Sequence, residues 1–218
     1  MRVRELRIGT VNTASSTLLV PALRDLRTLQ DTGGVEVINA QQAEIHRGLA
    51  EGTLDLGTVN VLPGDDVPVG LVASELIHGQ PVACLRTDHP LAAGDHVTVA
   101  QLREQHFVAM RPGYVMHRFA HRLFAGTMPP TTYATDGAEM GKAMVAEGLG
   151  ISILPDYSIS ADPLVTAGVI TTRPIHGDGT TVSLLMLRRN AEHVPAQLRD
   201  LQSALVRHAS AYRSRASA

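Results

Sequence analysis

The fold is decided near the start of the chain, where residues 6–11 read LRIGTV. The alternation of apolar and polar side chains in this stretch predicts a β-strand. Polar residues 12–16 (NTASS) follow as a turn, and leucines at helical spacing from Leu19 to Leu29 then predict a helix. The order of strand, polar turn and helix is typical of an α/β unit.

The same alternation continues along the chain. Residues 35–39 predict a second strand, Ile45 and Leu49 lie on a short second helix, and residues 54–59 predict a third strand. Strands that are separated by helices pair in parallel through right-handed crossovers. The polar turns are therefore expected at the carboxyl ends of a parallel sheet, where α/β proteins bind their ligands.

A similar pattern recurs in the second half of the chain. Residues 69–86 are a long β-prone stretch, interrupted at residues 79–81, that is expected to cross between two lobes. The segment that follows residue 155 is expected to be irregular until the last strand. Beyond the crossing we predict strands at residues 107–110, 132–135, 151–155 and 181–188, helices after Thr98, Tyr114 and Asp136, and a closing amphipathic helix through Val194, Leu198, Leu201 and Leu205.

Two of these helix starts carry a capping-box pattern. In this arrangement a side chain and the one three residues later satisfy each other's backbone amides. The predicted pairs are Thr98 with Gln101 and Asp136 with Glu139. Both helices are therefore expected to begin at these residues.

The two similar halves predict an α/β fold of two Rossmann-like lobes joined by crossing strands. We assign residues 1–78 and 182–218 to lobe I and residues 79–181 to lobe II. The sequence holds no exact internal repeat, so this division depends on the recurring order of strands and helices.

The composition excludes several classes of protein. The 218 residues carry 21 acidic and 19 basic side chains, and the net charge of −2 gives no general attraction to nucleic acid. The apolar runs are shorter than the roughly 20 residues that cross a bilayer, and no stretch resembles a signal peptide, so a cytoplasmic protein is expected. Cys84 is the only cysteine, which excludes a disulfide within one chain.

The sequence lacks the common catalytic and cofactor motifs, and we expect neither an enzyme nor a bound cofactor or metal. Gly148 and Gly150 lie between a helix and a strand, which favours a left-handed helix end with close packing. His117 and His121 share a helix face, but without a third ligand they are expected to face solvent. Cys84 lies in an apolar stretch and is expected to be a buried small side chain.

Two turns favour the binding of an anion. Residues 12–16 gather hydroxyl and amide groups where a helix begins, and free N–H groups there favour a carboxylate. Ser15 or Ser16 is also expected to cap that helix. Arg111 follows a strand and precedes a helix, where it is either a bidentate partner for the same carboxylate or a solvated turn residue.

An ordered set of motifs resembles the effector-binding domain of LysR-type transcriptional regulators, which is similar to type 2 periplasmic binding proteins. In this order and spacing the motifs cover nearly the whole chain. They are LRIG at residues 6–9, LAEGTLDLG at 49–57, HPL at 89–91, VAQL at 99–102, VAEGLGI at 145–151 and LP at 154–155.

The resemblance implies a sensor that binds a small, anionic metabolite between two lobes. It also implies homodimers, often tetramers when intact, and an action on DNA through an N-terminal winged helix-turn-helix domain. That domain is absent from the 218 residues, so a truncated protein is expected; the alternative is a free-standing solute-binding protein of the same fold. By position, the implied effector contacts are Thr13, Ser15, Ser16, Gln42, Asn60, Arg111, Tyr114 and Thr135.

Two departures from the family pattern matter. Some aromatic-acid sensors of the family carry arginine where this chain has Asn60, so Arg111 is the remaining candidate anchor for a carboxylate. The peroxide-sensing branch uses paired cysteines in the second lobe, and this sequence has none there. The family arrangement further implies that the first helix of one protomer packs against residues 116–124 of its partner.

Overall fold

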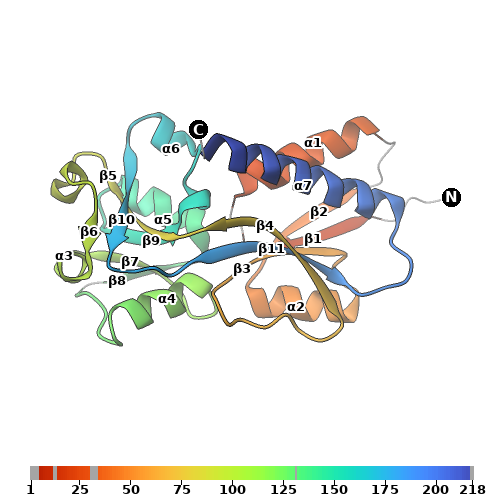
Figure 1. The fold of residues 1–218 in the computed structure, drawn as a ribbon, viewed down its shortest axis with the longest axis horizontal. Coiled ribbons are helices and arrows are strands. Elements are labelled where there is room, and N and C mark those ends of the chain that lie inside the picture. The colour runs from red at the N-terminus through yellow and green to blue at the C-terminus, as the bar shows by residue number, and fades with distance from the viewer. Residues whose placement is uncertain (1–4, 12–13, 30–33, 131, 217–218) are drawn as a thin grey trace. The chain divides into compact units, whose positions relative to one another are not determined.

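A computed structural model describes the chain except for residues 1–4, 12–13, 30–33, 131 and 217–218. The chain divides into two compact units. One contains Met1–His78 and Ser183–Ala218, and the other contains Gly79–Val182. Each unit has its own sheet with helices packed against it (Figure 1), which confirms the predicted α/β class.

The first unit is built on a mixed sheet with the strand order β2-β1-β3-β11-β4. β1 lies parallel to both β2 and β3, whereas β11 runs antiparallel to β3. The parallel pairing predicted for the first three strands is therefore confirmed. The strands are β1 (Leu6–Thr10), β2 (Val35–Asn39), β3 (Leu56–Val61), β4 (Leu71–Gly79) and β11 (Val182–Arg189).

Helices cover both faces of this sheet (Figure 1). α1 (Val20–Leu29), which continues from the π-type turn η1 (Ser15–Leu19), packs beside α7 (Ala196–Ala216) on one face. On the other face lies α2 (Gln42–Glu51), whose Ile45 packs in a fully buried cluster with Val59 and Leu187. Because both faces are covered, the central strand β3 is buried along all but its last residue.

The second unit has the strand order β6-β10-β5-β9-β7-β8. β7 is parallel to β8 and β9, and β5 is antiparallel to β9 and β10. The strands are β5 (Pro81–Arg86), β6 (Val97–Thr98), β7 (Phe107–Met110), β8 (Thr132–Thr135), β9 (Ile151–Pro155) and β10 (Ile170–His176). The helices are η2 (Pro90–Ala93), α3 (Val99–Arg103), α4 (Val115–Leu123), α5 (Gly137–Ala146), η3 (Asp156–Ser158) and α6 (Pro163–Thr166).

The prediction of an irregular segment after residue 155 is wrong, because this segment contains the strand β10. β10 pairs with β5 along its first five residues and with β6 at Ile175 and His176. Pro174 obscured the strand in the sequence, because proline cannot donate a ladder hydrogen bond and argues against an interior strand. Tertiary pairing has overridden this local signal.

One predicted capping box is confirmed and the other is wrong. The Gln101 amide donates to Thr98 Oγ1 at 3.2 Å, and the Thr98 amide donates to Gln101 Oε1 at 2.8 Å. Asp136 does occupy the N-cap of α5, but its side chain makes no capping hydrogen bond. Its carboxylate pairs with Arg111 instead.

The two glycines after α5 have the backbone roles that were predicted. Gly148 has a φ of 78° where the helix ends, and Gly150 has a φ of 153°. A Cβ atom on Gly150 would lie 2.5 Å from the carbonyl oxygen of His106, so no larger residue fits there. Separately, among the described residues no helix has both the length and the apolar character needed to cross a bilayer.

Candidate functional site

In the first unit, polar groups gather where the parallel strands β1, β2 and β3 end. The Val11 amide donates to the Thr58 carbonyl at 3.2 Å, and the Ala40 amide, just after β2, donates to the Thr10 carbonyl at 3.0 Å. The hydroxyl groups of Thr10 and Thr58 are hydrogen-bonded at 2.9 Å and are buried. This neutral pair, which the sequence analysis did not single out, joins the end of β1 to the middle of β3.

Ser15 and Ser16 open η1 at this end of the sheet. The cap position belongs to Ala14, which has a left-handed φ of 55°, so the predicted serine cap is wrong. The Leu18 amide donates to the Ala14 carbonyl at 2.9 Å and closes the turn. Ser15 is half-buried and Ser16 is exposed, so the Ser16 side chain is open to a ligand. Thr13 lies outside the described residues.

Gln42 lies after the second strand, as expected, whereas Asn60 does not lie after the third. Gln42 is the first residue of α2 and is half-buried, and the helix start is held by the Gln41 amide, which donates to Glu44 Oε2 at 2.9 Å. Asn60 was expected after the third strand, but β3 extends to Val61. Asn60 therefore lies within the strand, opposite Leu184 of β11, and is 8% exposed. The prediction failed because a strand buried on both faces shows no alternation that marks its end.

In the second unit, Arg111, Tyr114 and Thr135 come together where the parallel strands β7 and β8 end. The Arg111 amide donates to the Thr135 carbonyl at 3.1 Å, and the Tyr114 amide donates to the Arg111 carbonyl at 3.3 Å. Thr135 and Tyr114 are buried, whereas the side chain of Arg111 is 51% exposed. The turn therefore holds an accessible guanidinium group beside two buried polar residues.

Asp136 is a residue of this cluster that sequence analysis assigned to another role. Its Oδ1 lies 3.0 Å from Arg111 Nε, and its side chain is 48% exposed. The signal that could have found the pair is positional: Arg111 and Asp136 each follow directly on one of two neighbouring parallel strands, whose ends share one edge of the sheet. A guanidinium group has five N–H donors, and this contact uses the one at Nε.

Other candidate chemistry is not supported. Burial raises the pKa of the Cys84 thiol to about 12, so the thiol is protonated at neutral pH and is a poor nucleophile. The rings of His117 and His121 lie 4.3 Å apart on α4, and burial together with the charge of His121 lowers the pKa of His117. Within the described part of the chain, no group of three His, Cys, Asp or Glu residues could hold a metal ion.

These features define a class of protein: an α/β protein whose units each present polar side chains at the carboxyl ends of parallel strands, the usual ligand-binding edge of such sheets. Comparison with known families identifies the family within this class. The model of the LysR substrate binding domain matches residues 2–210, and the chain belongs to this family.

Two curated relatives are transcriptional regulators rather than enzymes. The HTH-type transcriptional regulator TtuA of Agrobacterium vitis is 28% identical over 181 residues, which cover 78% of this chain and 59% of TtuA. The Hca operon transcriptional activator HcaR of Escherichia coli (strain K12) is 28% identical over 204 residues, which cover 90% of this chain and 65% of HcaR. The chain thus spans less than two thirds of the length of each.

Solved structures share the fold. The reduced OxyR regulatory domain from Pseudomonas aeruginosa superimposes with a TM-score of 0.72 and 19% identity, covering 94% of this chain and 98% of that domain. The effector-binding domain of a BenM variant gives a TM-score of 0.73 and 18% identity, covering 96% of both chains. The predicted fold is confirmed, and the chain is an effector-binding domain of the LysR type.

Proposed function

We propose that this domain senses a small anionic metabolite on behalf of a LysR-type regulator that acts on DNA through a separate N-terminal domain. The observation that carries the proposal is the accessible guanidinium group of Arg111, a residue whose backbone amide donates to the Thr135 carbonyl where β7 and β8 end. The two regulators named above, one of them called HTH-type, support this role over that of a free-standing solute-binding protein.

The proposed contacts divide by chemistry. Arg111 provides the positive charge for a carboxylate, because a planar guanidinium pairs with it through two hydrogen bonds. Uncharged hydrogen-bonding groups complete the proposed contacts. These are Thr13, Ser15, Ser16, Gln42 and Asn60 of the first unit and Tyr114 and Thr135 of the second.

A thermal-unfolding screen tests the proposal. The chain is heated with a panel of small carboxylates and with the corresponding neutral amides. A ligand that binds only the folded state raises the midpoint, by an amount that grows with its concentration relative to its Kd. We expect at least one acid to stabilise the protein more than its amide does.

Two variants make the screen specific. Arg111→Ala should abolish the stabilisation, whereas Arg118→Ala, which removes an exposed arginine of α4 in the same unit, should preserve it. A panel in which no acid stabilises the protein, or in which Arg111→Ala responds like the wild type, would contradict the proposed anchor.

We also propose a homodimer in which α1 of one protomer packs against α4 of its partner, with effector binding shifting the dimer between two arrangements. Val20, at the start of α1, is an exposed apolar side chain that such contact would cover. Arg24 on α1 and Arg122 on α4 are exposed cations, so added salt should strengthen the association by screening their repulsion. Sedimentation that shows a monomer at every concentration and salt level would contradict this pairing.

A further inference from the structure

The first unit carries a groove whose lining includes none of the residues proposed to contact the effector. It is formed between α7 and the strands β4 and β11, and its volume is about 430 Å³. Pockets that hold small organic molecules span roughly 300 to 1,000 Å³. β4 is the edge strand beyond β11, so the groove lies where the sheet ends beside the helix.

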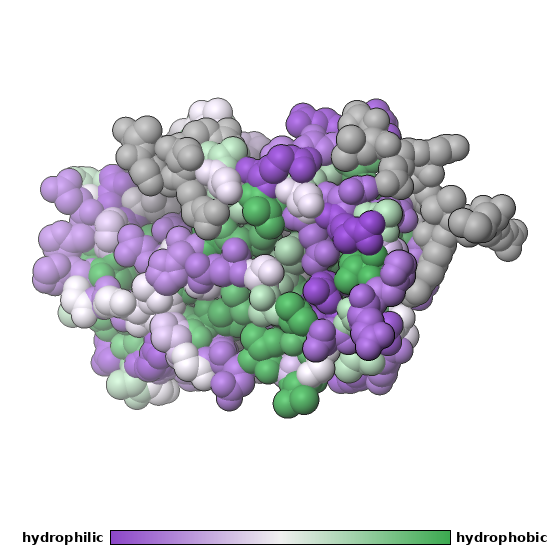
Figure 2. Space-filling view, turned by 45° about the vertical axis from the view of Figure 1, so that its right-hand side comes forward, coloured by the Kyte–Doolittle hydropathy of each residue, from purple (hydrophilic) through white to green (hydrophobic). Residues whose placement is uncertain are grey.

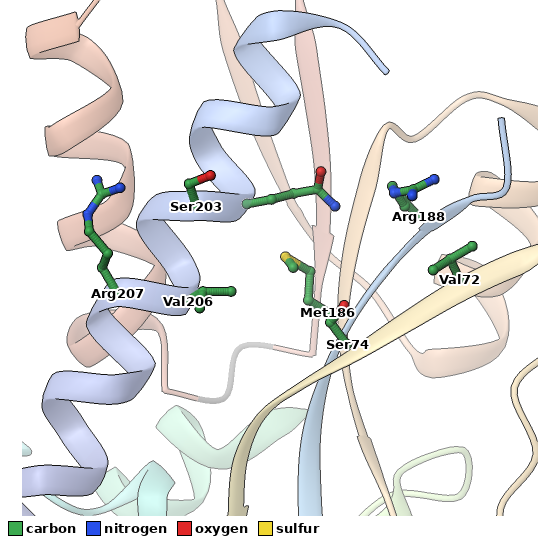
Figure 3. A pocket seen from close by; sticks show the side chains of 8 residues that line it. Val72, Ser74, Met186, Arg188, Ser203, Val206 and Arg207 are labelled. Carbon is green, nitrogen blue, oxygen red and sulfur yellow. The ribbon is translucent and has the colours of Figure 1, made fainter. Parts of the chain in front are cut away.

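The floor of this groove is apolar. Met186 of β11 is buried, Val72 of β4 is half-buried, and Val206 of α7 is 44% exposed. Figure 2 shows hydrophobic side chains reaching the surface among hydrophilic ones. Figure 3 shows Val206 directed from α7 toward the strands that carry Met186 and Val72. A ligand seated there would remove this apolar surface from water.

Arg188 supplies the positive charge of the groove, and no carboxylate is among its lining residues in the described part of the chain. Arg207 also lines the groove but is engaged elsewhere. Arg207 Nη2 lies 3.7 Å from Asp25 Oδ2, and Figure 3 shows Arg207 on the side of α7 away from the strands. Arg188 donates from Nη1 to the Arg189 carbonyl at 2.9 Å. In the described part of the chain, no carboxylate oxygen lies within 4.0 Å of the Arg188 guanidinium.

Two other cavities have a different charge pattern. In the cavity of the second unit, Arg86 lies beside Asp88, with Nη2 and Oδ2 2.6 Å apart. In a further cavity of the first unit, Asp55 is among the lining residues, together with Arg189. Each of those cavities supplies its own negative charge, whereas the groove beside α7 does not.

We propose that this groove is a second ligand site, which binds a small organic anion with a compact apolar body, such as a monocarboxylate. The carboxylate pairs with Arg188, and the apolar body covers Val72, Met186 and Val206. Arginine suits this role because its guanidinium group is weakly hydrated and matches the geometry of a carboxylate. The site is separate from the contacts proposed for the effector and does not depend on them.

Methyl NMR of the chain tests the site directly. The seven methionines are labelled with ¹³C at their methyl groups, and Met186 reports on the groove while Met128 of the second unit serves as a reference. The probes are hexanoate and phenylacetate, with hexanamide and phenylacetamide as neutral controls. We expect both acids to shift the Met186 signal saturably, and the amides to bind about tenfold more weakly or worse, since they lose a charge-assisted hydrogen bond.

Three variants accompany the titration. Arg188→Ala should weaken hexanoate binding about tenfold or more, whereas Arg189→Ala, at the neighbouring exposed arginine, should leave it unchanged. Val206→Glu places a carboxylate at an exposed position of α7 and should weaken binding as strongly without touching β11. Unchanged affinity in both Arg188→Ala and Val206→Glu would overturn the proposal, as would a Met186 signal that ignores the acids or follows the amides equally.

Arg111→Ala separates this site from the proposed effector site. The variant should leave the Met186 response intact, because Arg111 belongs to the other unit. A Met186 response that disappears in Arg111→Ala and persists in Arg188→Ala would overturn the second site while supporting Arg111 as the effector anchor. A response that disappears in Arg188→Ala alone supports the second site, whatever the outcome of the thermal screen.

Discussion

Each unit buries a pair of polar side chains bonded to each other, and the two pairs differ in their chemistry. In the first unit, the buried pair is neutral: the Thr10 and Thr58 hydroxyls lie 2.9 Å apart. In the second unit, the buried pair is ionic: Lys142 bonds to Asp162, and the two residues are 1% and 4% exposed. A neutral pair costs little to desolvate, whereas an ion pair is stable only while both partners and their hydrogen bonds remain.

The contrast extends to the strand ends themselves. Exposed Ser16 in the first unit offers an uncharged hydroxyl, while Arg111 and Asp136 in the second offer a half-exposed ion pair. The two strand ends therefore offer different chemistry to a ligand: a charged group in the second unit and an uncharged hydroxyl in the first. Substitutions in each unit test these differences.

The largest effect is expected from Lys142→Met. Lys142 is the only lysine of the chain, and its Nζ donates to Asp162, to Glu139 Oε1 at 2.9 Å and to the Ser158 carbonyl at 3.0 Å. Removing the ammonium leaves Asp162 as a buried unpaired charge, which costs about 3 to 5 kcal/mol. Urea unfolding of the variant and the wild type measures the loss.

The double variant Lys142→Met with Asp162→Asn provides the control. Asparagine removes the unpaired charge. Its side-chain oxygen can still accept the hydrogen bond that the Leu164 amide donates to Asp162 Oδ1 at 2.8 Å. The double variant should therefore be more stable than Lys142→Met alone. A loss below about 1 kcal/mol for the single variant would show that the ion pair is dispensable.

A smaller effect is expected for the neutral pair. Thr58→Val keeps the shape of the side chain but removes the buried hydrogen bond to Thr10, at a cost of about 1 to 2 kcal/mol in the free energy of unfolding. The double variant with Thr10→Val should lie closer to the wild type, because neither hydroxyl is then left without this partner. Equal costs for Thr58→Val and Lys142→Met would remove the distinction between the two units.

The half-exposed ion pair should matter for binding more than for stability. Asp136→Asn removes the negative charge 3.0 Å from Arg111 Nε, and the free energy of unfolding should change by less than about 1 kcal/mol. The affinity for a carboxylate should rise severalfold, because the negative charge of Asp136 no longer offsets the positive charge of the guanidinium group. Calorimetric titration checks the affinity, and a weakened affinity would mean that Asp136 orients Arg111 rather than competing for it.

The smallest effect concerns the contact between α1 and α7. Asp25 Oδ2 lies 2.9 Å from His208 Nε2, and this hydrogen bond holds the pKa of Asp25 below its ordinary value of 3.8. A lowered pKa in the folded state stabilises the protein fully above pH 3.8, and the contribution is lost as the pH falls through the lowered pKa. In melting temperatures measured across pH 2 to 6, Asp25→Asn should reduce the loss of stability at acid pH. An unchanged loss would mean that other carboxylates cause it.

Much of the fold could be predicted because local signals and tertiary structure agree. The strands at 35–39, 107–110, 132–135 and 151–155 have the predicted bounds, since glycine, proline and polar turns delimit them. β10 was not predicted, because Pro174 argues against a strand in the sequence, whereas pairing with β5 forms the strand in the folded unit.

The candidate site was only partly predictable. Arg111 and Thr135 meet because parallel strands end at one edge, which the order of elements already implies. Asp136 was misassigned because capping and ion pairing compete for the same carboxylate, and only the folded structure decides between them. The groove beside α7 could not be predicted. Val72 and Val206 are far apart in the sequence, and both line the groove only because of the order in which the strands pair in the sheet.

A calorimetric cycle tests the central claim, that Arg111 supplies the charge for recognition of the anion. The carboxylate that gives the largest thermal shift and its neutral amide are each titrated into the wild type and into Arg111→Ala. The account predicts that the wild type prefers the acid by about tenfold or more, whereas the variant shows no preference, a coupling of about 1.4 kcal/mol or more. The same preference in both proteins would contradict it.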